Sequence, residues 1–158
     1  MLSSDSLTPG EERMAHNLVD PTELLPHAAP ATESARLLLF TMRRVAAHGL
    51  DDAHAAHAML CAFGMSFRRP LVLLRALMAE ASRVSSRRIL VAPCCCPRMT
   101  DAEANLIGAV AIARRDAHGA HAMLNGILGV NDCLGALSSA QALGQAFEDL
   151  GKPLAELA

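Results

Sequence analysis

The chain has 158 residues, of which 52% are hydrophobic and 19% are charged, and its formal net charge is −2. This length fits one domain with a sizeable core, and the near-neutral charge gives no overall attraction to nucleic acid or to an acidic membrane surface. The core must be mainly aliphatic, since the sequence has no Trp or Tyr and only 4 Phe. Because Ala, Leu, Met and Arg favour helices, we expect an all-α single-domain bundle of five to six helices.

The start of the chain lacks the apolar stretch of a signal peptide, and no run reaches the roughly 18 apolar residues of a membrane span. The 5 cysteines are an odd number and three of them are adjacent, which does not fit a secreted disulfide framework. We therefore predict a cytoplasmic protein with reduced thiols and no membrane contact. Residues 1–31 are rich in proline and are predicted to form a mobile or loosely docked arm before a helical domain at 32–158.

Apolar periodicity and capping residues predict the helices in chain order. A first helix follows the N-cap Thr32 and ends at Gly49, a second covers about 52–67, and a third covers 70–84 with Pro70 at its first position. Residues 89–92 are a candidate short extended piece. Thr100 and Glu103 form a capping-box pattern that starts a fourth helix. A fifth is predicted at 116–128, and the last at about 139–150.

A nine-residue phrase occurs twice, as DAHAAHAML at 52–60 and as DAHGAHAML at 116–124. An apolar helix that ends in two arginines precedes each copy, and another helix follows it. This pattern favours two pseudo-symmetric three-helix halves joined by an irregular Cys-containing segment. Asp52 and Asp116, which begin the two copies, are interpreted as helix N-caps.

The histidines of this repeat are candidate metal ligands. His54, His57 and Cys61 share one narrow sector of the second helix, and His118 with His121 could complete a site across a pseudo-dyad. The same sector lies opposite the aromatic stripe of that helix, and such a face is usually solvated. The sequence therefore leaves two interpretations open, a zinc or copper site and a solvent-facing or interface surface.

The stretch PCCCP at 93–97 is the least ordinary part of the sequence. Cys94 and Cys96 form a C-x-C pair suited to a soft cation such as Cu(I) or Zn²⁺. Alternatively, Cys95 and Cys96 form a vicinal disulfide as a redox switch, or one thiolate acts as a nucleophile activated by Arg98 or by the helix start at Thr100. The remaining interpretation is packing, because cysteine is a small, readily buried residue.

Seven arginines lie between residues 68 and 98, with Glu80 as the only acid among them. Such a segment could contact an anion or an acidic partner. The arginines that we expect at this contact are Arg68, Arg69, Arg87, Arg88 and Arg98. No aromatic interleaving accompanies them, so nucleic acid is not the expected partner. Acidic residues of the last helix could instead balance the arginines within the fold or across a dimer.

The stretch HGLDDAHAAHAMLCAFGMSFRRPLVLLRALMAE, followed by VAPCCCPRMT, resembles a family of small uncharacterised proteobacterial proteins known as a domain of unknown function. The resemblance covers residues 35–103 approximately. It implies a soluble bacterial protein with no assigned activity, substrate or cofactor, and it transfers no catalytic residue.

The sequence thus predicts a non-enzymatic interaction or regulatory module, a homodimer or other homo-oligomer with an unidentified protein partner. The alternative is a thiol-redox or metal-binding sensor that uses the CCC segment and the HxxH histidines. An enzyme with a cysteine nucleophile is a third hypothesis, for which the sequence offers no base or orienting partner, so no catalytic residue is assigned. No cofactor is expected, apart from zinc or copper under the alternative.

Overall fold

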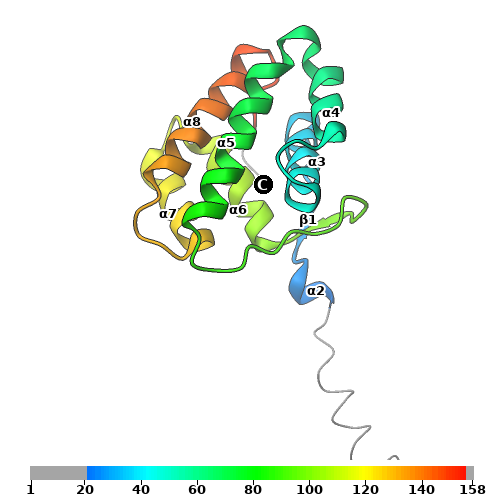
Figure 1. Ribbon diagram of the computed structural model, residues 1–158. Coiled ribbons are helices and arrows are strands. Elements are labelled where there is room, and N and C mark those ends of the chain that lie inside the picture. Colours follow the sequence, from blue (N-terminus) through cyan, green and yellow to red (C-terminus); the bar gives the residue numbers. More distant parts are fainter. Residues whose placement is uncertain (1–20, 156–158) are drawn as a thin grey trace, which may run out of the picture.

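The computed structural model describes residues 21–155, which form a bundle of helices (Figure 1). The helices are α2 (Pro21–Leu24), α3 (Glu33–His48), α4 (Ala53–Phe63), α5 (Arg68–Val84), α6 (Asp101–Ile112), α7 (Ala117–Leu128) and α8 (Leu134–Asp149). The 3-10 turn η1 (Gly64–Phe67) joins α4 to α5, and the two-residue strands β1 (His27–Ala28) and β2 (Arg98–Met99) pair antiparallel. The predicted all-α fold is confirmed.

Side-chain caps start four helices where the sequence predicts them, and one of the four is the capping box of Thr100 and Glu103 at α6. The Thr32 hydroxyl accepts a hydrogen bond from a backbone amide of the first turn of α3, and Gly49 ends that helix with a φ of 97°. Asp52 and Asp116 accept the corresponding bonds at the starts of α4 and α7. Each cap satisfies an amide that has no partner within its own helix, so the interpretation of both aspartates as caps is confirmed.

Two predicted boundaries near the α4–α5 connection are wrong. The second helix ends at Phe63 and not at about residue 67, because Gly64 adopts a φ of 57° that breaks the helix and leads into η1. Helix α5 begins at Arg68, so Pro70 is the third helical residue and not the first. Proline fits this position too, since the amides of the first turn have no helical partner.

The last helix begins at Leu134, about five residues before its predicted start near 139. Ala136 and Ala140 are fully buried, so the apolar stripe of α8 extends towards its N-terminus and packing decides where the helix starts. The candidate extended piece at 89–92 is not a strand in the described structure; the strand of this segment is β2, further along.

The helices divide into two sets with the same contact pattern. Helices α3, α4 and α5 all contact one another, and so do α6, α7 and α8. The sets meet through equivalent helices, since α5 packs along α8 and α3 contacts α6 (Figure 1). Each copy of the repeated phrase lies at the start of the second helix of its set. Two pseudo-symmetric three-helix units would produce this pattern.

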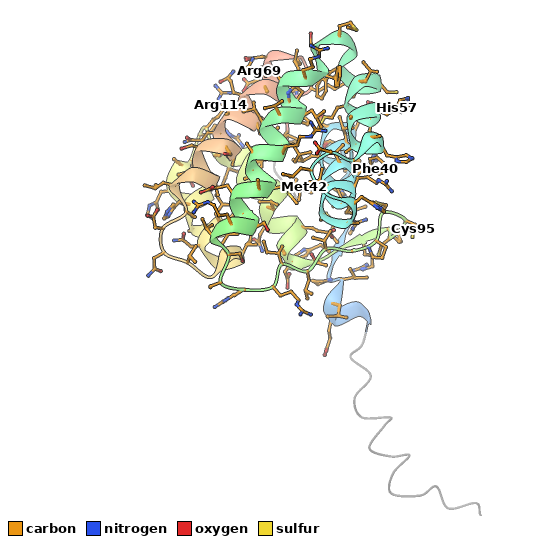
Figure 2. All side chains as sticks on the ribbon, viewed as in Figure 1. Phe40, Met42, His57, Arg69, Cys95 and Arg114 are labelled. Carbon is orange, nitrogen blue, oxygen red and sulfur yellow. The ribbon has the colours of Figure 1, made fainter. Side chains whose placement is uncertain are left out.

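The core between these helices is aliphatic, as the composition predicts. Met42 points from α3 into the interior (Figure 2), and Phe63 meets Phe147 edge-on with ring centroids 5.1 Å apart. The large side chains with the least exposure include Leu38, Met59, Leu74, Leu77, Ile107, Leu124, Leu128 and Leu143. Both helix sets contribute to this one cluster, so the halves share a single core.

The part of the predicted arm that the structure describes, residues 21–31, is held against the bundle. His27 of β1 lies opposite Met99 of β2. The Arg98 side chain donates from Nε to the Leu25 carbonyl over 2.6 Å and from Nη2 to the Pro26 carbonyl over 2.7 Å. Residues 1–20, the rest of the predicted arm, lie outside the described residues.

Candidate functional site

The three adjacent cysteines lie in the segment between α5 and α6, residues 85–100, which contains no helix. At its start, Ser86 donates from its amide to the Leu128 carbonyl over 2.9 Å and from its hydroxyl to the Gly129 carbonyl over 2.7 Å. The segment then runs along one end of the bundle (Figure 1). Its second half is built around a buried ion pair.

Arg43 of α3 and Glu103 of α6 form this ion pair, and their side chains are only 2% and 1% exposed. Arg43 donates from Nε to Oε1 of Glu103 over 2.7 Å and from Nη2 to Oε2 over 3.0 Å. The capping box positions the carboxylate, because Glu103 also accepts the Thr100 amide over 2.9 Å. Such two-pronged contacts are the strong form of an arginine–carboxylate pair. The hydrogen bond to Glu103 is the main reason that the pKa of Arg43 is raised.

The cysteine-containing segment satisfies the remaining polar atoms of this pair. The Ala92 amide donates to Oε1 of Glu103 over 3.0 Å. From the other side, Arg43 donates from Nη1 to the Cys96 carbonyl over 2.8 Å and from Nη2 to the Arg98 carbonyl over 2.6 Å. Buried polar atoms need such partners. These bonds therefore fix the backbone of the segment to the core on both sides of the cysteines.

Residues 93–96 form a tight turn, which we call the cysteine turn. The Cys96 amide donates to the Pro93 carbonyl over 3.0 Å, so Cys94 and Cys95 are the two central residues of a β-turn. Cys95 is exposed and projects from the tip (Figure 2), whereas Cys94 and Cys96 are half-buried. The turn thus presents one exposed thiol and two partly exposed thiols on a base that is fixed to the core.

Two guanidinium groups lie beside the cysteine turn. The pKa of Arg44 is raised mainly by its hydrogen bond to Asp52 and to a smaller extent by Cys94, and the pKa of Arg43 is raised mainly by Glu103 and to a smaller extent by Cys96 and Cys94. Arg44 is itself held in place, because it donates from Nε and Nη2 to the Asp52 carboxylate over 3.1 and 2.7 Å. This hydrogen-bonded guanidinium keeps the pKa of Asp52 well below its usual range. Fixed positive charge therefore lies next to two of the three sulfurs of the turn.

The other two cysteines have different surroundings. Cys133 is only 2% exposed and donates from Sγ to Oδ1 of Asn125 over 2.9 Å. Burial raises the pKa of this thiol, and a buried thiol of raised pKa is chemically inert. Cys61 is exposed on α4, and its Sγ lies 3.7 Å from Nε2 of His57.

The structure does not gather the predicted metal ligands into one site. His54, His57 and His118 are exposed and His121 is half-buried. Nδ1 of His54 lies 3.0 Å from Nη2 of Arg44. Within residues 21–155, no three His, Cys, Asp or Glu side chains lie close enough together to hold one metal ion. One copy of the described chain thus offers pairs of ligands at most, and metal binding stays a prediction.

The arginines predicted to contact an anion divide into two groups. Two of them are used within the fold, since Nη1 of Arg69 lies 2.8 Å from Oδ2 of Asp149 and Arg98 holds the segment before α3. The acidic end of α8 therefore balances one arginine of the basic segment. All five arginines are exposed. Of the remaining three, which are Arg68, Arg87 and Arg88, Arg87 donates a long hydrogen bond of 3.5 Å from Nη1 to the Gly126 carbonyl, and the contact of the set with a partner stays a prediction.

Sequence reasoning did not assign Arg43 to the site and interpreted Glu103 only as a helix cap. The signal for Arg43 is its position on the apolar face of the first helix, beside Leu39 and Met42, which are both buried. A buried guanidinium requires a negatively charged partner. A capping-box glutamate at the start of another apolar helix is a suitable candidate for that partner.

In the described part of the chain, no helix is both long enough and apolar enough to span a membrane. No curated protein and no solved structure matches the chain. A protein-family model described as a family of unknown function, DUF6628, matches residues 14–152. The match includes the second half of the chain, which the resemblance noted from the sequence did not cover. The chain therefore belongs to the DUF6628 family.

Proposed function

We propose that the protein is a non-enzymatic regulatory module that senses oxidants through the thiols of the cysteine turn. The observation that carries this proposal is the combination of an exposed Cys95 and partly exposed Cys94 and Cys96 with a turn whose base is fixed to the buried Arg43–Glu103 pair. Cysteines that serve only to fill the core have no need of an exposed turn. A sensor needs accessible sulfurs together with a rigid connection through which their state reaches the rest of the protein.

The charges around the turn support the same proposal. Thiol oxidation proceeds through the thiolate and through anionic oxygen adducts of sulfur, which nearby cations stabilise. Cys94 contributes to the raised pKa of Arg44, after the larger contribution of the hydrogen bond to Asp52, and the Asp52 carboxylate holds Arg44 in place. Cys94 is therefore the sulfur that we expect to react first.

The proposed reaction is oxidation of two thiols to a disulfide by a hydroperoxide. The Cys94 thiolate attacks the peroxide O–O bond; with hydrogen peroxide this gives a sulfenic acid and one water molecule. The thiol of Cys96 then displaces that hydroxyl group as a second water, and the S–S bond forms. Two thiols thus lose two electrons and two protons in all, and the peroxide is reduced to two water molecules.

The pairing of Cys94 with Cys96 is favoured over pairing of neighbours. Adjacent Cα atoms lie about 3.8 Å apart across a trans peptide, which is below the roughly 4.4–6.8 Å of ordinary disulfides. Cys94 and Cys96 are separated by one further residue, so the bond between them needs less distortion. The Cys96 carbonyl accepts a hydrogen bond from Arg43. A change in the conformation of the turn on disulfide formation therefore moves an acceptor of the buried Arg43–Glu103 pair.

The test is thiol chemistry on the full chain with Cys61→Ser, which leaves the turn and the buried Cys133. We expect the turn thiols to react with a chromogenic disulfide reagent in the folded protein and Cys133 to react only after denaturation. In a separate sample without this reagent, one equivalent of hydrogen peroxide should remove the mass of two hydrogens, and peptide mapping should find the disulfide between Cys94 and Cys96.

Arg44→Gln and Arg69→Gln are matched variants for the role of charge. Both replace a guanidinium that binds an aspartate, but Arg44 is the one that interacts with the cysteine turn. Oxidation should slow at least about threefold in Arg44→Gln and stay unchanged in Arg69→Gln. Thiols of the turn that react no faster than Cys133, or a disulfide that forms only between chains, would refute the proposal.

A further inference from the structure

His57 and Cys61 form an exposed pair on α4 that the cysteine turn does not use. They are spaced one helical turn apart, at i and i+4, so both side chains project from the same face. Sγ of Cys61 lies 3.8 Å from Nδ1 and 3.7 Å from Nε2 of His57. His57 projects outward from the bundle in Figure 2, and both side chains are exposed.

This separation matches the spacing of two ligands around a tetrahedral zinc ion. Zn–S and Zn–N bonds of about 2.3 and 2.0–2.1 Å at a tetrahedral angle place sulfur and nitrogen about 3.6 Å apart. The observed 3.7 Å differs from that value by far less than an exposed side chain moves. His57 is free to turn about its own side-chain bonds and direct either ring nitrogen to a metal, since solvent surrounds it.

A structural zinc site has four protein ligands, and two of the common sets are Cys₂His₂ and Cys₃His. One copy of α4 supplies one cysteine and one histidine, and no third ligand lies close enough within residues 21–155. A twofold axis beside α4 would bring an identical pair from a second copy, because an isologous interface places the same residues on both sides. We propose that His57 and Cys61 are half of an intersubunit Cys₂His₂ site, which binds one zinc ion between two copies of this chain.

The surface around the pair favours a second copy as the partner. Leu60, next to Cys61 in the chain, is 37% exposed and Met65, in the η1 turn that follows α4, is 82% exposed, so this end of α4 offers apolar surface beside the ligands. Asp51, just before α4, is fully exposed and has only a long contact of 4.0 Å from Oδ1 to Nη2 of Arg75, and Arg68, just after η1, is exposed too. In an antiparallel pair of α4 helices centred on the ligands, the acidic start of one helix lies near the basic end of the other. Charge complementarity of this kind fixes the register of an interface.

The second copy of the repeated phrase provides a natural contrast. At the place that corresponds to Cys61 it has Asn125, whose Nδ2 lies 3.4 Å from Nδ1 of His121. Asn125 also accepts a hydrogen bond from the buried Cys133. The same spacing therefore serves internal packing on α7 and leaves an open thiol–imidazole pair on α4. Zinc binding is thus assigned to the first copy alone.

Binding requires the thiolate of Cys61 and the neutral imidazole of His57. Each thiol therefore releases one proton to solvent, and two protons leave for each zinc bound. The apolar contacts around the site then add to the metal–ligand bonds in holding the two copies together.

The test uses the full chain with Cys94→Ser, Cys95→Ser and Cys96→Ser, so that the thiols of the cysteine turn cannot bind zinc and the outcome is independent of the proposed sensing function. Sedimentation velocity and elemental analysis are measured with and without Zn²⁺. We expect a monomer without metal, a dimer with one zinc per two chains, and reversal by EDTA. Co²⁺ in place of Zn²⁺ should give thiolate-to-cobalt charge-transfer absorption.

Four exposed positions supply the variants. Cys61→Ser and His57→Ala should each abolish the stoichiometric zinc and the dimer, whereas His54→Ala and His118→Ala should change neither. Circular dichroism confirms that each variant is folded, which is expected because all four side chains lie on the surface. The proposal is overturned if zinc does not bind, if it binds one per chain without association, if the dimer forms equally without metal, or if Cys61→Ser keeps the zinc.

Discussion

Nε of Arg43 lies 2.7 Å from Oε1 of Glu103, although the two residues are separated by 60 positions in the chain. Their contact joins α3 to α6, the first helices of the two three-helix sets. The same two side chains also bind backbone groups of Ala92, Cys96, Arg98 and Thr100. One buried pair therefore links the two halves of the bundle to each other and to the cysteine turn.

Replacement of Arg43 by methionine tests how much this pair stabilises the fold. Met fills much of the apolar volume of the side chain but leaves the Glu103 carboxylate buried without its partner, together with two backbone carbonyls. Breaking a buried pair in this way costs about 3–5 kcal/mol. We expect the free energy of unfolding, measured by urea titration with circular dichroism, to fall by that amount.

Arg69→Met is the matched control for this substitution. Nη1 of Arg69 lies 2.8 Å from Oδ2 of Asp149, a distance similar to that of the buried pair, but the two side chains are 54% and 40% exposed. Exposed ion pairs contribute little, because water solvates both charges when the pair is broken. Arg69→Met should therefore lower stability far less than Arg43→Met. If the two variants lose the same free energy of unfolding, burial does not determine how much the Arg43–Glu103 pair contributes to stability.

Two helical glycines should respond to alanine with opposite signs. A Cβ at Gly126 of α7 would meet no atom within 4 Å, so Gly126→Ala gains helix propensity and should stabilise the protein by about 0.5–1 kcal/mol. A Cβ at Gly144 of α8 would lie 2.8 Å from the Val110 carbonyl oxygen of α6. The backbone cannot give way easily there, so Gly144→Ala should destabilise by about 1–3 kcal/mol despite the same gain in propensity. Thermal unfolding of the two variants decides whether the α6–α8 contact is this close.

The charge of Asp52 should make part of the stability depend on pH. The hydrogen-bonded Arg44 guanidinium lowers the pKa of Asp52 in the folded state. This contribution is complete above the unfolded pKa, about 4, and is lost as the pH falls through the folded value. Asp52→Asn keeps a good cap but removes the charge. The melting temperature of wild type should exceed that of Asp52→Asn at neutral pH, and the difference should shrink below about pH 4.

Arg44→Gln provides the background that isolates this effect. Without the guanidinium, the folded pKa of Asp52 loses its main cause of lowering, so Asp52→Asn should change the melting temperature much less at neutral pH. The inference that Arg44 lowers the pKa of Asp52 and so stabilises the fold is contradicted if Asp52→Asn changes the melting temperature equally at all pH values. It is also contradicted if that change is equal with and without Arg44.

The features that the sequence predicts well are the local ones. Thr32, Asp52, Thr100 and Asp116 cap helices because the bonds they make lie within three residues. The aliphatic stripes and the all-α fold follow from composition and period for the same reason. The start of α8 is less predictable, because the burial of Ala136 against other helices, and not a cap, sets it.

The candidate site depends on contacts between distant residues, which a single sequence does not reveal. The capping box marks Glu103, but nothing in the adjacent sequence indicates that Arg43 is its partner or that the CCC segment closes around both. The same holds for Arg98, which the sequence places in a basic segment as a contact for an anion. In the fold, its guanidinium binds two backbone carbonyls of residues 25 and 26.

Arg98→Met should therefore release the segment before α3 without unfolding the bundle. The variant loses two side-chain hydrogen bonds, of 2.6 and 2.7 Å, to the Leu25 and Pro26 carbonyls, but keeps its own carbonyl as acceptor for Arg43. Segments with few buried contacts open locally at a free energy below that of global unfolding. We expect thermolysin to cleave near Leu25 several-fold faster and the amides of β1 to exchange faster, with little change in the urea midpoint.

Arg88→Met removes an exposed arginine of the same basic segment and should leave both rates as in wild type. If Arg98→Met does the same, the other contacts hold the segment, which are the β1 pairing, the 2.6 Å contact of His27 Nε2 with Asp101 Oδ1 and the bond from the Ala29 amide to the Pro97 carbonyl, and Arg98 is available for the anion contact that the sequence predicts.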